Sequence, residues 1–191
     1  MSDLCLACGL CCDGTLFEAT ALTVREDGRL LADRQAVFVS EKGTQRFQQP
    51  CPAHERGRCS IYDDRPEVCR DFRCSVLTAV DSGALDEVGA RALIARAVEL
   101  RDVARPGLAG LLQASRPDPT AALAASVGLA ASAVPTALVA PTFVGLYNAV
   151  AALVDRQQDP KAFREQHSEV MRAAEELREL IGTSFFAGEN S

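Results

Sequence analysis

Hydrophobic residues in the second half of the chain recur at intervals of three and four, the spacing of one face of an α-helix. The clearest case is the C-terminal stretch, where Asp159-Pro160 predicts a capped helix start and Gly182 predicts the helix end. A second helix is expected over 85–104, ended by Arg105-Pro106-Gly107. The apolar face of the C-terminal helix is expected to hold Phe163, His167, Val170, Ala174, Leu177 and Ile181. His167 is therefore expected to be a packed, hydrogen-bonded histidine, and the tail after Gly182 to be loose.

The rest of this half has a weaker pattern. We expect at most a short helix over 108–114, a helix over 120–132 and another over 142–156. Residues 119–154 contain no charged side chain, a length that could cross a bilayer. Pro135, Pro141 and the Ala-rich composition favour a buried helical pair instead, with membrane insertion as the alternative.

The first 75 residues follow a different pattern. Residues 15–24 are rich in β-branched and large apolar side chains and predict a strand, followed by a turn over 26–29. Residues 36–39 and 44–48 predict a hairpin. The stretch from Asp63 to Glu67 predicts the start of a short helix, with Pro66 in its first turn, that carries Val68, Cys69 and Phe72.

These patterns together predict an α+β protein in two parts. We expect a small cysteine-rich, metal-stapled α+β module over 1–75 and an all-α helical domain over 76–191. A module of this size with few large apolar residues has a thin core and commonly needs a metal to hold its fold.

The cysteines are the main chemical signal, because all eight of them lie within the first 74 residues. Two residues separate the first two cysteines and again the second and third, and this spacing lets thiolates converge on one metal. Adjacent side chains diverge, so the vicinal pair is expected to serve two different metal atoms, or one of its sulfurs to bridge them. The expected ligands are Cys5, Cys8, Cys11, Cys12, Cys51, Cys59, Cys69 and Cys74.

Eight thiolates suit two tetrahedral zinc ions, two iron–sulfur clusters or one polynuclear site. Cys51-Pro52, remote from the first run, favours iron–sulfur, whereas the vicinal pair fits neither ferredoxins nor zinc ribbons. Soft ligands exclude magnesium and calcium but leave both zinc and iron open. A redox dithiol would explain Cys5 and Cys8 only, and inert buried thiols would not explain the spacing.

Residues near the cysteines could adjust the charge of such a site. Tyr62, Arg65, Arg70 and Arg73 could surround the ligands, where arginines would offset negative charge or donate to sulfur; ordinary surface arginines are the alternative. His54 could be a further ligand, although eight cysteines already suffice.

Charge and the N-terminus limit the partners. The net charge of −6 argues against nonspecific binding to nucleic acid or to an anionic membrane. The start of the sequence has no basic and apolar pattern typical of an export signal, so we expect a cytoplasmic protein. A cytoplasmic chain with this many cysteines is expected to bind metal or to do redox chemistry rather than to carry disulfides. The metal ion is the expected partner, and a protein partner and the oligomeric state are left open.

Residues 4–75 resemble the YkgJ-type cysteine-cluster family, which is described as zinc- or iron-chelating. The resemblance rests on C-x2-C-x2-C-C, on Cys51-Pro52 and on C-x-I-Y-x-x-R-P-x-x-C-R-x-F-x-C, which starts at Cys59. It implies metal chelation by the eight cysteines and no particular reaction. Flagellin lysine methylases are similar in this domain, but this chain has no glycine-rich motif for S-adenosylmethionine.

The sequence therefore predicts a protein that chelates zinc or iron in one polynuclear or two mononuclear sites. Two alternatives are kept. One is an iron–sulfur enzyme or electron-transfer protein acting on a protein or a small molecule, and the other is a membrane-associated metal carrier.

Overall fold

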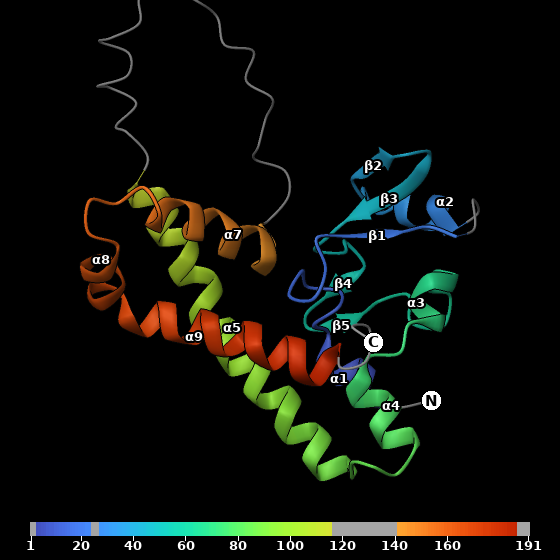
Figure 1. The fold of residues 1–191 in the computed structure, drawn as a ribbon. Coiled ribbons are helices and arrows are strands. Elements are labelled where there is room, and N and C mark those ends of the chain that lie inside the picture. The colour runs from blue at the N-terminus through green and yellow to red at the C-terminus, as the bar shows by residue number, and fades with distance from the viewer. Residues whose placement is uncertain (1–2, 24–26, 116–140, 187–191) are drawn as a thin grey trace, which may run out of the picture.

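The computed structural model describes residues 3–23, 27–115 and 141–186. Long helices form one side of the molecule, and a small sheet with several short helices forms the other (Figure 1). This arrangement confirms the predicted fold class, an α+β N-terminal part followed by an all-α part.

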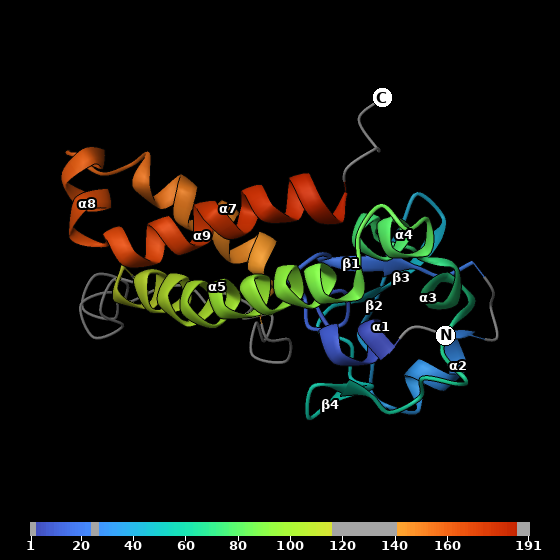
Figure 2. The same ribbon diagram turned by 90° about the horizontal axis from the view of Figure 1, so that it is seen from below.

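The helical part is built on α5 (Glu87–Ala114). Helices α7 (Phe143–Val154) and α9 (Ser168–Leu180) both pack against it; α9 lies over α5 in Figure 2 and crosses it at an angle in Figure 1. α8 (Pro160–Gln166) connects α7 to α9. Three of these helices begin as the sequence suggests: the side chains of Asp86, Thr142 and Asp159 each accept a hydrogen bond from a backbone N–H of the first turn.

The expected helix end at Arg105-Pro106-Gly107 is wrong, because α5 continues through Pro106 to Ala114. Proline removes one backbone donor, but Ala104, Leu108 and Leu111 lie buried on both sides of it and keep the helix packed. Gly107 lets α9 approach closely: a Cβ at this position would lie 2.5 Å from a methyl carbon of Val170. Tertiary packing thus overrides the local signal to stop.

The C-terminal helix also differs from the expectation. It begins at Pro160 as predicted but is interrupted at His167, which ends α8, precedes α9 and stacks on Phe163 with ring centroids 4.7 Å apart. The periodicity cannot reveal this break, because the three-and-four spacing continues across it. The tail is not loose up to residue 186, because 181–185 form a π-helical turn, η1 (Ile181–Phe185), and Phe185 is buried.

The sheet of the N-terminal part has three antiparallel strands in the order β1-β3-β2. β1 (Ala19–Ala21) is shorter than expected, whereas β2 (Phe38–Glu41) and β3 (Thr44–Gln48) form the predicted hairpin. Its two turn residues, Lys42 and Gly43, both have positive φ, as a two-residue hairpin turn requires. Where a turn was expected over 26–29, a short helix begins, α2 (Asp27–Ala32).

The elements that carry or adjoin cysteines lie below this sheet in Figure 1. They are α1 (Asp3–Cys8), the two-stranded ribbon of β4 (His54–Glu55) and β5 (Arg58–Cys59), α3 (Glu67–Asp71) and α4 (Ser75–Asp81). The short helix expected after Asp63 is therefore confirmed as α3. Helical structure resumes at Ser75, where the composition changes.

The described residues form two separate hydrophobic cores. The larger belongs to the long helices and also takes in Leu4, Leu10 and Leu16 from the beginning of the chain. The smaller lies under the sheet and consists of Leu31, Phe47, Ala53 and Ile61. The first cysteine run is therefore anchored to the helical core, although the long helices that form this core come much later in the sequence.

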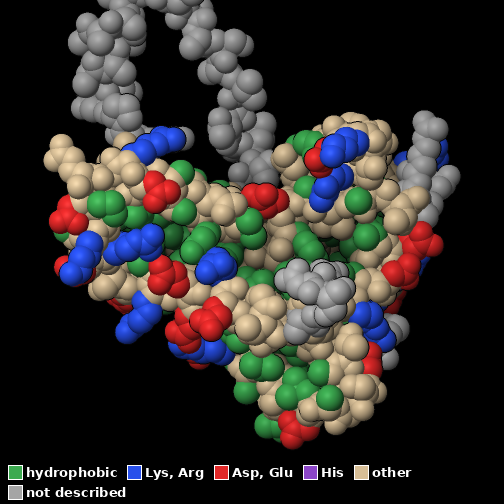
Figure 3. Space-filling view, in the orientation of Figure 1, with side chains coloured by type: hydrophobic (Ala, Val, Ile, Leu, Met, Phe, Trp, Pro, Cys, Tyr) green, Lys and Arg blue, Asp and Glu red, His purple; other side chains and the backbone are tan. Residues whose placement is uncertain are grey.

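A shallow cleft of about 350 Å³ separates the sheet from α7, and hydrophobic side chains are visible at this junction (Figure 3). Most of the uncharged stretch 119–154, including the expected helix over 120–132, lies outside the described residues. Among the residues that are described, none of the helices has the length and apolar character needed to cross a bilayer.

Candidate metal centre

The first cysteine run combines a helix with a tight turn. Cys5 and Cys8 lie on α1, and Gly9 follows with φ +65°, a conformation that glycine adopts without strain. The backbone N–H groups of Cys12 and Asp13 both donate to the Gly9 carbonyl, at 2.9 and 3.0 Å. This turn brings the sulfurs of the vicinal pair to 3.6 Å from each other.

The second run reaches the same place from four different segments of the chain. Cys51 donates its backbone N–H to the Cys12 carbonyl at 2.7 Å, which joins the two runs directly. Cys59 lies on β5, Cys69 on α3, and Cys74 is the residue before the first turn of α4. These elements converge where the sheet part meets the helical part (Figure 1).

All eight cysteines line one cavity of about 390 Å³. All eight are free thiols; Cys5 is exposed and the others are half-buried. The structure thus brings together two cysteine runs that are about forty residues apart in sequence, as the spacing predicts. A cavity of this size lies within the range of cofactor sites.

The thiols surround the cavity without closing on one point. Within the ranges that the structure covers, no three Cys, His, Asp or Glu side chains already have the geometry of a finished metal site. Sulfurs on a tetrahedral zinc ion are about 3.8 Å apart, given Zn–S bonds of about 2.3 Å. Cys11 and Cys12 meet that spacing at 3.6 Å, so metal binding would require mainly the other sulfurs to move inward.

Burial and crowding raise the pKa of most of these thiols. Burial, together with smaller effects of neighbouring thiols, raises the pKa of Cys8 and of Cys69 to about 12 in each case. The pKa of Cys5, Cys51 and Cys74 is raised chiefly by burial as well. In the vicinal pair the hydrogen bond between the sulfurs lowers the pKa of Cys11 and raises that of Cys12. A bound cation would relieve this crowding, and its binding must displace protons at neutral pH.

The residues expected around the ligands all line the cavity, namely Tyr62, Arg65, Arg70 and Arg73. Arg65 lies 3.9 Å above the Tyr62 ring, donates to the carbonyls of Tyr62 and Cys69, and lowers the pKa of Cys5. Arg70 donates to the Arg65 carbonyl, and Arg73 pairs with Asp81 at 3.0 Å on the surface. Arg65 is therefore the arginine most closely integrated with the cysteines.

His54 also lines the cavity, and it packs against the turn of the first cysteine run. A Cβ on Gly9 would lie 2.5 Å from its Nε2 atom, which is buried and has no hydrogen-bond partner. His54 pairs with Cys59 across the β4–β5 ribbon, so both side chains lie on one face of it. A role for His54 as a ligand stays a prediction.

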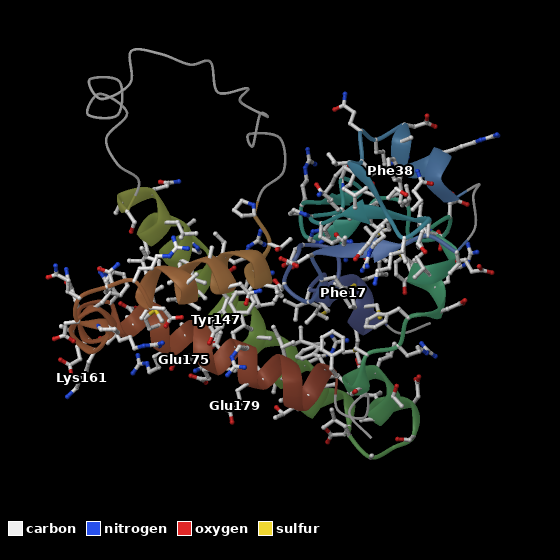
Figure 4. The ribbon with its side chains drawn as sticks, turned by 45° about the horizontal axis from the view of Figure 1, so that its top comes forward. Phe17, Phe38, Tyr147, Lys161, Glu175 and Glu179 are labelled. Atoms are coloured by element: carbon white, nitrogen blue, oxygen red, sulfur yellow. The ribbon has the colours of Figure 1, made fainter. Side chains whose placement is uncertain are left out.

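Aromatic residues form one wall of the cavity, and the sequence analysis did not assign them to it. Phe17 contacts Phe72 and Phe186 edge-to-face, with ring centroids 5.1 and 5.6 Å apart. Phe17 lies where the sheet part and the helical part meet (Figure 4). This wall joins three distant stretches of the chain, so no local pattern could have revealed it.

Two arginines of α5 hold the turn after Cys12, and the sequence analysis missed both. Arg101 donates to the Asp13 carboxylate at 2.6 Å, and the same carboxylate accepts the backbone N–H of Thr15 at 2.8 Å. Arg105 donates to the Asp13 carbonyl at 2.8 Å and to the Pro141 carbonyl. Asp13 is only 7% exposed, so this pair is largely shielded from water. The only sequence signal is the four-residue spacing of the two arginines beside the buried face of α5.

Comparison with known families agrees with the site. Residues 4–92 match the family model CxxCxxCC, whose description is "Putative zinc- or iron-chelating domain". The match extends through α4 into the first turns of α5. A search of curated proteins and a search of solved structures each found no match.

Proposed function

We propose that this protein chelates zinc or iron through its eight cysteine thiolates. The observation that carries the proposal is that both cysteine runs line a single cavity as free thiols. The donor set fits these metals, because thiolates favour zinc and iron over magnesium and calcium. The family description of residues 4–92 supports the same two metals.

The cavity also has the means to balance the charge of a thiolate site. Four thiolates around Zn²⁺ leave a net charge of −2, and Arg65 lies close enough to affect the Cys5, Cys11 and Cys69 thiols. Arg73 acts on Cys5 in the same direction. These cations reduce the cost of gathering negative sulfurs in a half-buried place.

Metal and sulfide analysis of the full chain, purified without oxygen, tests the proposal. Stoichiometric zinc or iron, lost when Cys8 and Cys69 are both changed to Ser, is the expected result. A wild-type protein that retains neither metal under reducing conditions refutes the proposal. Asp155→Asn, in the helical part away from the cavity, is the control and is expected to retain the wild-type metal content.

An iron–sulfur centre is a second candidate, and the size of the cavity favours it. A volume of about 390 Å³ exceeds what bare ions fill, and an apolar wall that includes Phe17 would shield a cluster from water. Acid-labile sulfide with a broad visible absorption is expected for this candidate, whereas a colourless zinc protein excludes it. An enzymatic role would require an iron with an open coordination position.

A further inference from the structure

The eight thiols do not share one surrounding. Cys8, Cys11 and Cys74 pack against the large core of the helical part. Cys51, Cys59 and Cys69 pack against the small core under the sheet. The cavity therefore has two differently built sides, each with its own set of cysteines.

The electrostatic effects between the thiols follow the same division, except for those that involve Cys11. Cys5, Cys11 and Cys74 act on Cys8, and Cys11 and Cys74 act on Cys5. On the other side, Cys51 and Cys59 act on both Cys12 and Cys69. Cys11 acts across the division, because its hydrogen bond with Cys12 is the largest influence on the Cys12 thiol and because it also affects Cys51 and Cys69.

The chain crosses between the two sides at two places. One is the vicinal pair, where Cys11 packs against the helical core while the Cys12 carbonyl accepts the N–H of Cys51. The other is the segment from α3 to α4, which places Cys69 against the sheet core and Cys74 against the helical core. At each crossing, two cysteines close in sequence belong to opposite sides.

We infer that the cavity holds two separate four-cysteine metal sites. The helical-side site is formed by Cys5, Cys8, Cys11 and Cys74, and the sheet-side site by Cys12, Cys51, Cys59 and Cys69. The 3.6 Å between the sulfurs of Cys11 and Cys12 would also suit two ligands of one ion. The packing of Cys8 and Cys74 against one core and of Cys51, Cys59 and Cys69 against the other decides for the division. Cys5 joins the first group because it lies with Cys8 on α1, and the sulfurs of Cys11 and Cys12 then form the border between adjacent sites.

This inference rests on the proposed metal binding and adds which thiols act together. Its test uses the full chain, freed of metal under reducing conditions and reloaded with Zn²⁺ alone. Cys69→Ser and Cys74→Ser form a matched pair, because the two positions are close in sequence but belong to opposite sites. Zinc is counted per chain after exposure to a chelator concentration that leaves the wild type loaded.

The wild type is expected to retain two zinc ions, each single variant one, and the double variant none. Loss of all zinc in either single variant, with far-ultraviolet circular dichroism unchanged, overturns the division into two sites. Retention of a single ion by the wild type overturns it as well. In both cases the proposed chelation stands, whereas a wild type that binds neither zinc nor iron refutes the chelation itself.

Cys5→Ser and Cys59→Ser replace the first pair if either variant fails to fold. Cys5 lies exposed on α1 and Cys59 is half-buried on the short β5, so neither change removes a fully buried side chain. The same halving of bound zinc is expected in each of these two variants. A loss of both ions, or of neither, counts against the two-site arrangement.

Discussion

The two sides of the cysteine cavity differ in how much core supports them. Nineteen buried hydrophobic residues from α5, α7, α9 and neighbouring segments form the helical core, whereas four form the core under the sheet. Burying a large apolar side chain contributes about 1.5–3 kcal/mol, so the sheet side gains far less from packing than the helical side. The difference shows where a metal matters most for the fold. The helical part can hold its shape by burial, whereas we expect the sheet side to depend on bonds between its cysteines and a metal.

Of all the changes, removal of the metal is expected to have the largest effect and to affect the two sides differently. Structural zinc contributes folding free energy directly, so a chelator under reducing conditions should loosen β2, β3 and α3 while α5 and α9 remain folded. Hydrogen exchange measured by mass spectrometry checks this, with loss of amide protection confined to the sheet side. Equal loss in both parts, or loss in neither, would contradict the contrast.

Truncations in the two cores should act in different places. Phe47→Ala removes the largest side chain of the sheet core and is expected to cost about 3–5 kcal/mol, with weaker metal retention. Leu177→Ala in the helical core is expected to cost about 2–5 kcal/mol and to leave metal content unchanged. Denaturant unfolding measures the loss of stability in both variants, and zinc analysis measures their metal content. An equal loss of metal in both variants would contradict the prediction.

Arg101→Gln tests the connection between the two parts. It leaves the shielded Asp13 carboxylate without its cationic partner, so we expect a loss of about 2 kcal/mol in stability and weaker metal binding. In a double-mutant cycle with Asp13→Asn the two effects should be strongly non-additive. Arg91→Gln removes an exposed ion pair with Glu87 on the same helix and is the control, with a change below about 0.5 kcal/mol. If Arg101→Gln and its control behave alike, α5 does not support the cysteine turn.

Two glycines of α5 give the smallest and most local test. Gly107→Ala places a methyl group against Val170 and is expected to cost about 1–3 kcal/mol, recovered in part by Val170→Ala. The methyl group added by Gly110→Ala would lie in open space, so this change is expected to stabilise the helix by about 0.5–1 kcal/mol. Thermal unfolding of both variants measures the effect, and metal content should stay the same in each. A stabilising Gly107→Ala would show that α9 does not approach α5 so closely.

The fold could be read in part from local patterns. The hairpin of β2 and β3, the short α3 and the starts of α7 and α8 follow from turn residues and helix caps. The continuation of α5 through Pro106 could not be read, because packing against distant helices decided it. The interruption at His167 could not be read either, because the three-and-four spacing of apolar residues continues across it. The burial of Phe185 has the same cause, since its partners lie far away in the chain.

The sequence by itself determined which groups are available to bind a metal: eight thiols in two runs, spaced so that a turn can bring neighbours together. Only the tertiary structure decided how they are sorted, because the side on which each sulfur lies depends on the core that anchors its element. It also brought Arg101 to Asp13, across 88 positions, and so tied the helical part to the cysteine turn. Local spacing encodes the chemistry of the ligands, whereas long-range burial sets their grouping.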